Sequence, residues 1–183
     1  MENRLSNKVI VYGGGVIGNL ASLCLINNGL DVYQIKSDVN NTVDRTYALS
    51  PGSVDWMKSI GLREIFFNSL YPIENIQIIR QDSKTNFSAD SVFQPALVYM
   101  VSEKKLMKEI QLKLKSHDIK IFSEPKKIII ENSPDQVRIE LEKGNLAASL
   151  LVACDGAKSR IKEHLDIRKK IKNFNQNAIV FNF

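Results

Sequence analysis

The sequence predicts an α/β fold: a Rossmann-like domain in which a parallel sheet is combined with an antiparallel β-meander. Three observations predict it. A buried strand, a glycine turn and a helix start follow one another near the N-terminus, and a second strand then completes a βαβ unit. Short alternating strands in the last third lead into a continuous apolar run. The 183 residues, 44% of them hydrophobic, suffice for a domain with its own core.

The glycine turn follows the first expected strand. Residues 9–12 are hydrophobic, and three glycines in a G-x-G-x-x-G frame come next. The first glycine permits the tight turn, the second lets backbone amides approach a pyrophosphate, and the third lets the helix pack on the strand. The free N–H groups at the start of that helix favour phosphate. The candidate phosphate-binding residues are Gly13, Gly15, Val16, Ile17 and Gly18.

A helix and a strand complete the first unit. Residues 17–28 have helical apolar spacing, and Gly29 is a natural residue to end the helix. Residues 31–36 alternate as a strand does. Such a βαβ unit is expected to be parallel and right-handed.

The middle of the chain predicts a loop, a helix and a hairpin. Residues 37–47 are polar and loop-like. Ser50 caps a helix that Gly61 ends. Residues 73–80 and 86–88 then flank Asp82-Ser83-Lys84-Thr85, a plausible hairpin turn.

A second long helix precedes the meander. Ser102 caps this helix, which has an apolar stripe. Residues 150–154 form a continuous apolar run, as in a strand covered on both faces, and residues 177–183 also have the pattern of a strand. The other expected strands are 119–122, 126–132, 137–142 and one that begins at residue 146.

A second motif follows the strand at 150–154. Asp155 and Gly156 stand at its carboxyl end, at the rim where α/β sheets bind ligands. The carboxylate can accept hydrogen bonds from ribose or ribityl hydroxyls, the glycine allows close backbone approach, and Ser159 can cap the next helix. Taken alone, such a segment is more often only a turn.

Together these motifs resemble the N-terminal half of an FAD-dependent aromatic hydroxylase. The glycine turn resembles that family's dinucleotide site, and Asp155, Gly156 and Ser159 resemble its DGxxSxxR motif. Residues 44–53 resemble its arginine-bearing loop and the helix that follows. Segments similar to the ubiquinone-biosynthesis (2-polyprenyl-6-methoxyphenol) hydroxylase branch are 99–101, 151–160 and 177–180.

The resemblance implies roles for these residues. Gly13, Gly15 and Gly18 would cradle the FAD pyrophosphate. Arg45 would contact the flavin side of the cofactor, and Asp155 would lie near the pyrophosphate, where NAD(P)H approaches. The family reduces FAD with NAD(P)H and uses O₂ to hydroxylate an activated ring. The implied division is 1–72 and 99–166 as the FAD-binding domain, 73–98 as a hairpin segment of a sheet-based substrate domain, and 167–183 as the beginning of that domain.

Three departures from the family pattern bear on cofactor binding. Lys36 stands where the family has an acid for the adenosine ribose, although Asp38 can substitute if the strand end is shifted. Lys162 replaces the motif's last arginine and loses its bidentate fork. The family's second flavin motif, Gly-Asp-Ala-Ala-His, is absent. We therefore expect a truncated or split protein that binds FAD weakly or not at all as this chain alone.

Two other functions stay open. One is an NADP-dependent Rossmann oxidoreductase with Lys36 on the 2′-phosphate, although the meander and the Asp155-Gly156 turn do not belong to that plan. The other is a non-catalytic, degenerate fragment or interaction module. A metal site is not indicated, because His117 and His164 show no ligand spacing with each other or with Cys24 and Cys154.

Charge and hydropathy suggest partners and location. Residues 158–172 hold seven basic residues and two acids, and thus account for the whole net charge of +5. A solvated face is the favoured interpretation and an anionic membrane the next, whereas nucleic acid is not supported because no aromatic residues interleave. The apolar segment 178–183 predicts self-association or binding to a separately encoded C-terminal half. We expect two reduced cysteines and a cytoplasmic protein, with peripheral contact at the inner face of a membrane as a further candidate.

Overall fold

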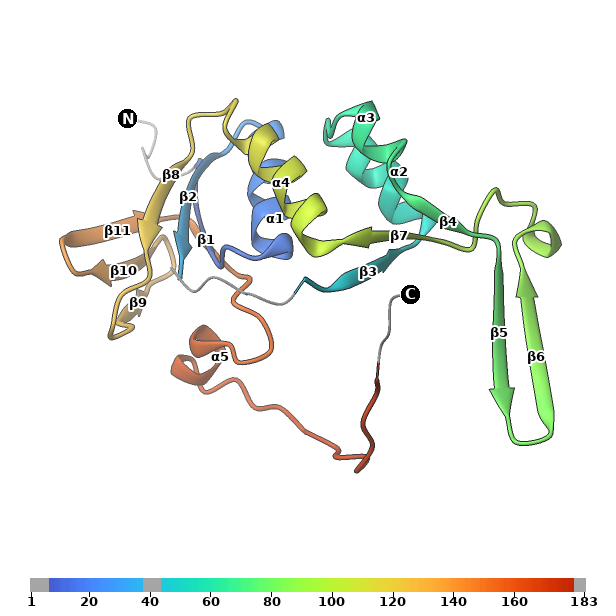
Figure 1. The fold of residues 1–183 in the computed structure, drawn as a ribbon. Helices are drawn as coiled ribbons and strands as arrows, with labels where there is room; N and C mark the ends of the chain where they lie inside the picture. The colour runs from blue at the N-terminus through green and yellow to red at the C-terminus, as the bar shows by residue number, and fades with distance from the viewer. Residues whose placement is uncertain (1–6, 38–43, 180–183) are drawn as a thin grey trace.

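The computed structural model describes residues 7–37 and 44–179, and its centre is a four-stranded parallel sheet (Figure 1). The strands lie in the order β12-β1-β2-β8, and every pair in the sheet is parallel, which confirms the predicted α/β class. All four strands therefore end at the same edge of the sheet. The bounds are β1 Lys8–Tyr12, β2 Asp31–Lys36, β8 Lys120–Ser123 and β12 Leu150–Ala153.

Helices cover one face of this sheet. Helices α1 and α4 lie side by side on it, and α2 and α3 pack beyond them around a shared apolar core (Figure 1). Ser50 and Ser102 cap α2 and α4 as predicted, because their hydroxyls accept hydrogen bonds from the backbone N–H of Ser53 and Lys105. The bounds are α1 Val16–Asn27, α2 Pro51–Ser59, α3 Glu64–Phe67 and α4 Glu103–Leu114.

The predicted β-meander covers the other face. Its three strands are antiparallel, in the order β11-β10-β9, and their inward side chains form a second core with Ile10, Tyr12 and Ile35 of the central sheet. The first meander strand is shorter than the predicted 126–132, because residues 124–129 form a link without strand pairing. The bounds are β9 Ile130–Asn132, β10 Val137–Leu141 and β11 Gly144–Ala148.

A small antiparallel sheet, β3-β7-β4, was not predicted. It joins Thr46–Leu49 (β3), Val98–Ser102 (β7) and Tyr71–Ile73 (β4). The predicted loop over 37–47 is therefore wrong at Thr46 and Tyr47, which pair with Ser102 and Val101. The strands are short, and their partners lie far along the chain, so no local pattern marks them.

A two-stranded hairpin extends away from the body of the molecule (Figure 1). Its strands are β5 (Asn75–Arg80) and β6 (Ser83–Ser88), and a short 3-10 helix, η1 (Asp90–Val92), follows. The hairpin was predicted, but its turn is Gln81-Asp82 and not 82–85, because Ser83 pairs directly with Arg80. Polar turn-forming residues at 83–85 thus lie in a strand whose side chains are exposed.

The last part of the described chain contains one helix and an extended segment. Helix α5 (Arg160–His164) follows the Asp155-Gly156 turn, and no regular element follows it up to residue 179. The predicted strand at 177–183 is not seen in residues 177–179, which pair with no strand of the described chain, and its remaining residues lie outside that part. Within residues 7–37 and 44–179, no helix has the length and apolar character needed to cross a bilayer.

Candidate nucleotide-binding site

The glycine turn lies at the common carboxyl edge of the sheet, pressed against its neighbours. Gly13 has φ of +137° and donates its N–H to the carbonyl of Ile35 at 2.8 Å. A Cβ at Gly13 would lie 2.2 Å from the carbonyl oxygen of Cys154 and 3.1 Å from the N atom of Asp155. The structure thus brings the first glycine next to the second predicted motif.

The third glycine fixes the helix to the turn. A Cβ at Gly18 would lie 2.1 Å from the carbonyl oxygen of Gly13, so α1 can approach the turn only if this position has no side chain. This is the close helix packing that the motif predicts. Gly14 is constrained as well, because its Cβ would lie 2.5 Å from the Cβ of Lys36, a contact that the motif alone does not reveal.

Gly15 differs from these three glycines. A Cβ there would meet no atom of the described residues within 4 Å, so this side of the turn is open with respect to them. Gly15 is also the N-cap residue of α1, which has neither a side-chain cap nor an acid in its first turn. The first N–H groups of a 12-residue helix are therefore left for an anionic group, and the exposed Ile17 stands beside them.

A buried polar network holds the carbonyls of the turn. Gln34 donates to the carbonyl of Gly13 at 3.2 Å and to Oδ1 of Asn19 at 2.8 Å, and Asn19 donates to the carbonyl of Gly14 at 3.1 Å. Both side chains are almost fully buried. Because the carbonyl oxygens of Gly13 and Gly14 accept hydrogen bonds from these buried side chains, the turn is held with its open side toward Gly15. The sequence signal that could have revealed this network is a glutamine in the centre of β2, between Tyr33 and Ile35.

Lys36 is the last residue of β2, as the sequence predicted. Its half-buried side chain lies against Gly14, at the place where dinucleotide-binding folds commonly present an acid to the ribose. The turn therefore fits a pyrophosphate, while the end of β2, where the ribose of a dinucleotide would lie, presents the cationic side chain of Lys36. Asp38, the predicted substitute, lies outside the described residues.

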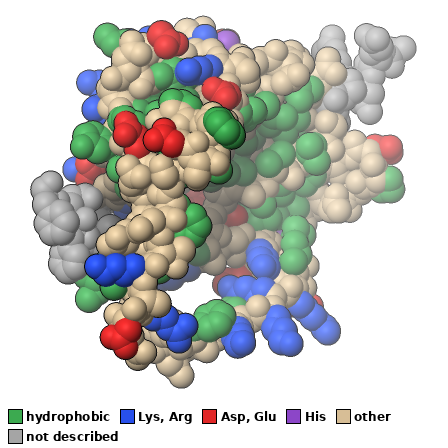
Figure 2. Space-filling view, turned by 90° about the vertical axis from the view of Figure 1, so that its right-hand side faces the viewer, with side chains coloured by type: hydrophobic (Ala, Val, Ile, Leu, Met, Phe, Trp, Pro, Cys, Tyr) green, Lys and Arg blue, Asp and Glu red, His purple; other side chains and the backbone are tan. Residues whose placement is uncertain are grey.

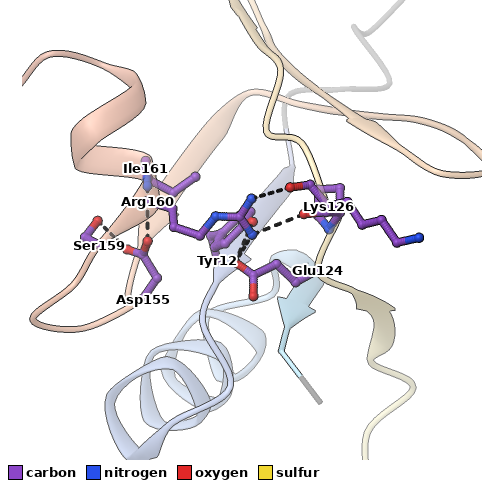
Figure 3. Close-up of polar contacts among 8 residues, drawn as sticks. Tyr12, Glu124, Lys126, Asp155, Ser159, Arg160 and Ile161 are labelled. Atoms are coloured by element: carbon purple, nitrogen blue, oxygen red, sulfur yellow. Dashed lines mark hydrogen bonds and ion pairs between the residues drawn. The ribbon is translucent and has the colours of Figure 1, made fainter. Parts of the chain in front are cut away.

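Asp155 fixes the start of α5. Its Oδ1 accepts a hydrogen bond from the hydroxyl of Ser159 at 2.6 Å, and its Oδ2 accepts one from the N–H of Ile161 at 3.1 Å (Figure 3). Ser159 caps the helix by accepting from the N–H of Lys162, as predicted. Gly156 has φ of +84°, which a side chain would strain. A contact of Asp155 with a cofactor stays a prediction.

Arg45 pairs with the start of α4. Its Nε lies 3.9 Å from Oε2 of Glu103, and its side chain is 61% exposed. Asp44, the residue before it, accepts a hydrogen bond from the N–H of Lys104. Burial, followed by the charge of Glu103, raises the pKa of nearby Tyr47. The predicted contact of Arg45 with the flavin side of a cofactor also stays a prediction.

An unpredicted polar cluster joins the ends of β1 and β8 to α5 (Figure 3). Oε1 of Glu124 accepts hydrogen bonds from the hydroxyl of Tyr12 at 3.1 Å and from Nη1 of Arg160 at 2.8 Å. Arg160 also donates to the carbonyls of Pro125 and Lys126. Nothing in the local sequence marks these residues, because the cluster depends on the packing of three separate elements.

A cavity of about 590 Å³ lies beside the second motif. Asp155 and Gly156 line it together with apolar residues of the meander, β12 and α5, and the three glycines of the first motif do not. The second motif therefore lies between the glycine turn on one side and this cavity on the other. The apolar lining residues include Ile130, Val137, Leu151, Ile161, Leu165 and Ile167.

Comparison with known proteins agrees with this geometry. A family described as FAD binding domain matches residues 6–182. The chain belongs to this FAD-binding family. The fold and the predicted resemblance to the N-terminal portion of FAD-dependent aromatic hydroxylases are thereby confirmed.

Two curated relatives and one solved structure illustrate the family. Kynurenine 3-monooxygenase of Caenorhabditis briggsae is 23% identical over 86% of this chain, and ubiquinone hydroxylase UbiL of Rhodospirillum rubrum is 24% identical over 94%. The chain spans only 40% and 42% of these relatives' lengths. The crystal structure of p-nitrophenol 4-monooxygenase PnpA from Pseudomonas putida DLL-E4 superposes with a TM-score of 0.73 at 19% identity, covering 87% of this chain and 43% of that one, which shows a shared fold.

Proposed function

We propose that this chain is the FAD-binding, N-terminal part of a flavin-dependent monooxygenase that hydroxylates an aromatic ring. The observation that carries the proposal is the uncapped N-terminus of α1 beside the open side of Gly15, within a chain of the FAD-binding family. Backbone N–H groups there bind the pyrophosphate of FAD, and Asp155 and Arg45 are the further candidate contacts.

The cofactor supplies the oxygen chemistry when bound, and NAD(P)H is the proposed reductant. The residues of this chain bind and orient the cofactor. The glycine turn holds the pyrophosphate, and the Gln34–Asn19 network keeps the turn open toward it. The wall behind the turn is closed, since Gly13 touches Cys154 and Gly14 touches Lys36. Among the described residues, the open side from which the cofactor can approach this turn is that of Gly15.

A polyprenyl-phenol of ubiquinone biosynthesis is the proposed substrate. Its support is the 24% identical ubiquinone hydroxylase, while the other relative is named for a different substrate, kynurenine. The chain lacks the family's Gly-Asp motif and spans less than half of these relatives, so we propose that it is not active alone. A separately encoded C-terminal half, self-association through residues 178–183 and peripheral membrane contact stay proposals for its partners.

Lys36 favours a second candidate, an NADP-dependent oxidoreductase. A cation at the end of β2 suits the 2′-phosphate of an adenosine better than the bare ribose hydroxyls of FAD. The two candidates differ in the ligand that the same turn prefers, so a comparison of ADP with 2′,5′-ADP separates them.

Titration of the chain with FAD, ADP and 2′,5′-ADP tests the proposal. We expect weak FAD binding, followed by flavin fluorescence, because the ribose meets Lys36 and the flavin is left uncovered. Lys36→Glu should strengthen FAD binding by restoring a ribose acceptor, and Lys108→Glu, at an exposed position of α4, is the matched charge control. A strong preference for 2′,5′-ADP that Lys36→Glu abolishes would favour the second candidate. Sub-micromolar FAD binding by the unmodified chain would contradict the expected weakness.

A further inference from the structure

We propose that Arg160 is a positioning residue that fixes the wall of the nucleotide site beyond the end of β2. The inference rests on the proposed binding of a dinucleotide at the glycine turn. Arg160 is the first residue of α5, four residues after Gly156, and its side chain reaches the segment 124–126 that follows β8 (Figure 3).

The guanidinium makes three contacts with this short segment. Nη1 donates to Oε1 of Glu124 at 2.8 Å and to the carbonyl of Pro125 at 3.2 Å, and Nη2 donates to the carbonyl of Lys126 at 2.7 Å. The planar fork of arginine suits such a set of acceptors, whereas the ammonium of a lysine acts as a single point donor. The contacts hold both the side chain and the backbone of the segment.

The segment lies where strand pairing stops. The N–H of Glu124 donates to the carbonyl of Lys36 at 2.9 Å, just beyond the end of β8. Pro125 has no N–H with which to extend that ladder, and the next strand, β9, begins only at Ile130. Arg160 therefore holds the backbone at Pro125 and Lys126, which belong to no strand of the described chain.

Tyr12 provides a second anchor for the same carboxylate. It is 1% exposed, and its hydroxyl donates to Oε1 of Glu124 at 3.1 Å. Burial first, and the charge and hydrogen bond of Glu124 next, raise the pKa of Tyr12. The phenol consequently stays protonated at neutral pH and remains a donor, so Glu124 is held from β1 as well as from α5.

The order of the strands explains why this tie matters for a ligand. The Asp155 turn follows β12 and the segment 124–126 follows β8, which are the two outer strands of the sheet. The glycine turn and Lys36 end the two inner strands. A dinucleotide with its pyrophosphate at the start of α1 extends its adenosine over the end of β2. The adenosine then meets the wall that Arg160 holds, and the pyrophosphate does not.

Binding of ADP and of inorganic pyrophosphate by Arg160→Met tests this inference. In calorimetric titrations of the full chain, ADP affinity should fall roughly three- to tenfold, the range of about one hydrogen bond's net contribution, while pyrophosphate affinity stays unchanged. The matched control is Arg138→Met, which removes an exposed ion pair with Glu131 on the meander and should alter neither ligand. Circular dichroism checks that each variant is folded.

The two possible failures are distinguishable. Unchanged ADP affinity in folded Arg160→Met, or equal losses for both ligands, would overturn the inference alone. Failure of the unmodified chain to bind ADP would contradict the proposed function on which the inference rests. If Arg160→Met does not fold, Arg160→Lys keeps the charge but cannot serve the three acceptors together, and it should show the same selective loss for ADP.

Discussion

The carboxyl edge of the central sheet and the β5–β6 hairpin are built in opposite ways. At the edge, glycines 13, 14 and 18 leave no room for a Cβ, and buried polar side chains are paired. In the hairpin, Ile76, Ile78 and Phe87 share one face by register and are 36%, 55% and 47% exposed. Figure 2, which views the molecule from the side on which the hairpin lies, shows hydrophobic side chains at the surface of that side.

This difference indicates how closely each region is packed by the described residues. The edge is held by contacts among those residues. The hairpin pairs its backbone locally, and the described residues leave its apolar face exposed, so this face contributes little to stability. The glycine turn is therefore expected to be well formed in the chain alone, and the hairpin less so.

The strongest test of the packed edge is Gly13→Ala, matched with Gly15→Ala. The first change places a Cβ 2.2 Å from the carbonyl oxygen of Cys154 at a φ of +137°, and it should cost about 3 kcal/mol of unfolding free energy. The second enters open space in extended backbone and should change stability by less than about 0.5 kcal/mol. Urea denaturation measures both, and equal losses would show that the turn is not packed as described.

A smaller difference in unfolding free energy is expected when the same substitution, glutamine to leucine, is made in each of the two regions. Gln34→Leu leaves the carbonyl of Gly13 and Oδ1 of Asn19 without their buried donor, so we expect a loss of about 1–2 kcal/mol. Gln77→Leu removes an exposed hairpin hydrogen bond to Asn86 and should cost less than about 0.5 kcal/mol. The midpoints of urea unfolding give the comparison. A Gln77→Leu loss as large as that of Gln34→Leu would mean that the hairpin is as tightly built as the edge.

The same contrast explains what the sequence could predict of the fold. The βαβ unit, the capped helices and the meander carry local signals, namely periodicity, a cap residue or a turn, and each was found. The β3-β7-β4 sheet was missed because its short strands, such as Thr46–Leu49, depend on partners about 50 residues away. The hairpin turn was misplaced because Ser83, Lys84 and Thr85 have the composition of a turn but pair in an exposed strand.

The site divides in a similar way. The positions of Gly13, Gly15, Gly18 and Lys36 at the carboxyl edge were predicted because a motif or a strand end places them, and their binding of a nucleotide stays a prediction. The constraint on Gly14 was not predicted, since it is a contact with Lys36 that only the fold creates. The second polar cluster, of Tyr12, Glu124 and Arg160, joins three elements that are distant in sequence, so no spacing rule could reveal it.

The central claim is that the open side of Gly15 binds the pyrophosphate, and ADP binding by Gly15→Val tests it most directly. A valine branch there occupies the space from which a pyrophosphate approaches, while the extended backbone of Gly15 tolerates the residue. We expect a folded variant, by circular dichroism, that has lost at least about tenfold in ADP affinity, or about 1.4 kcal/mol of binding free energy. Unchanged ADP affinity in a folded Gly15→Val chain would place the nucleotide site elsewhere and contradict the account.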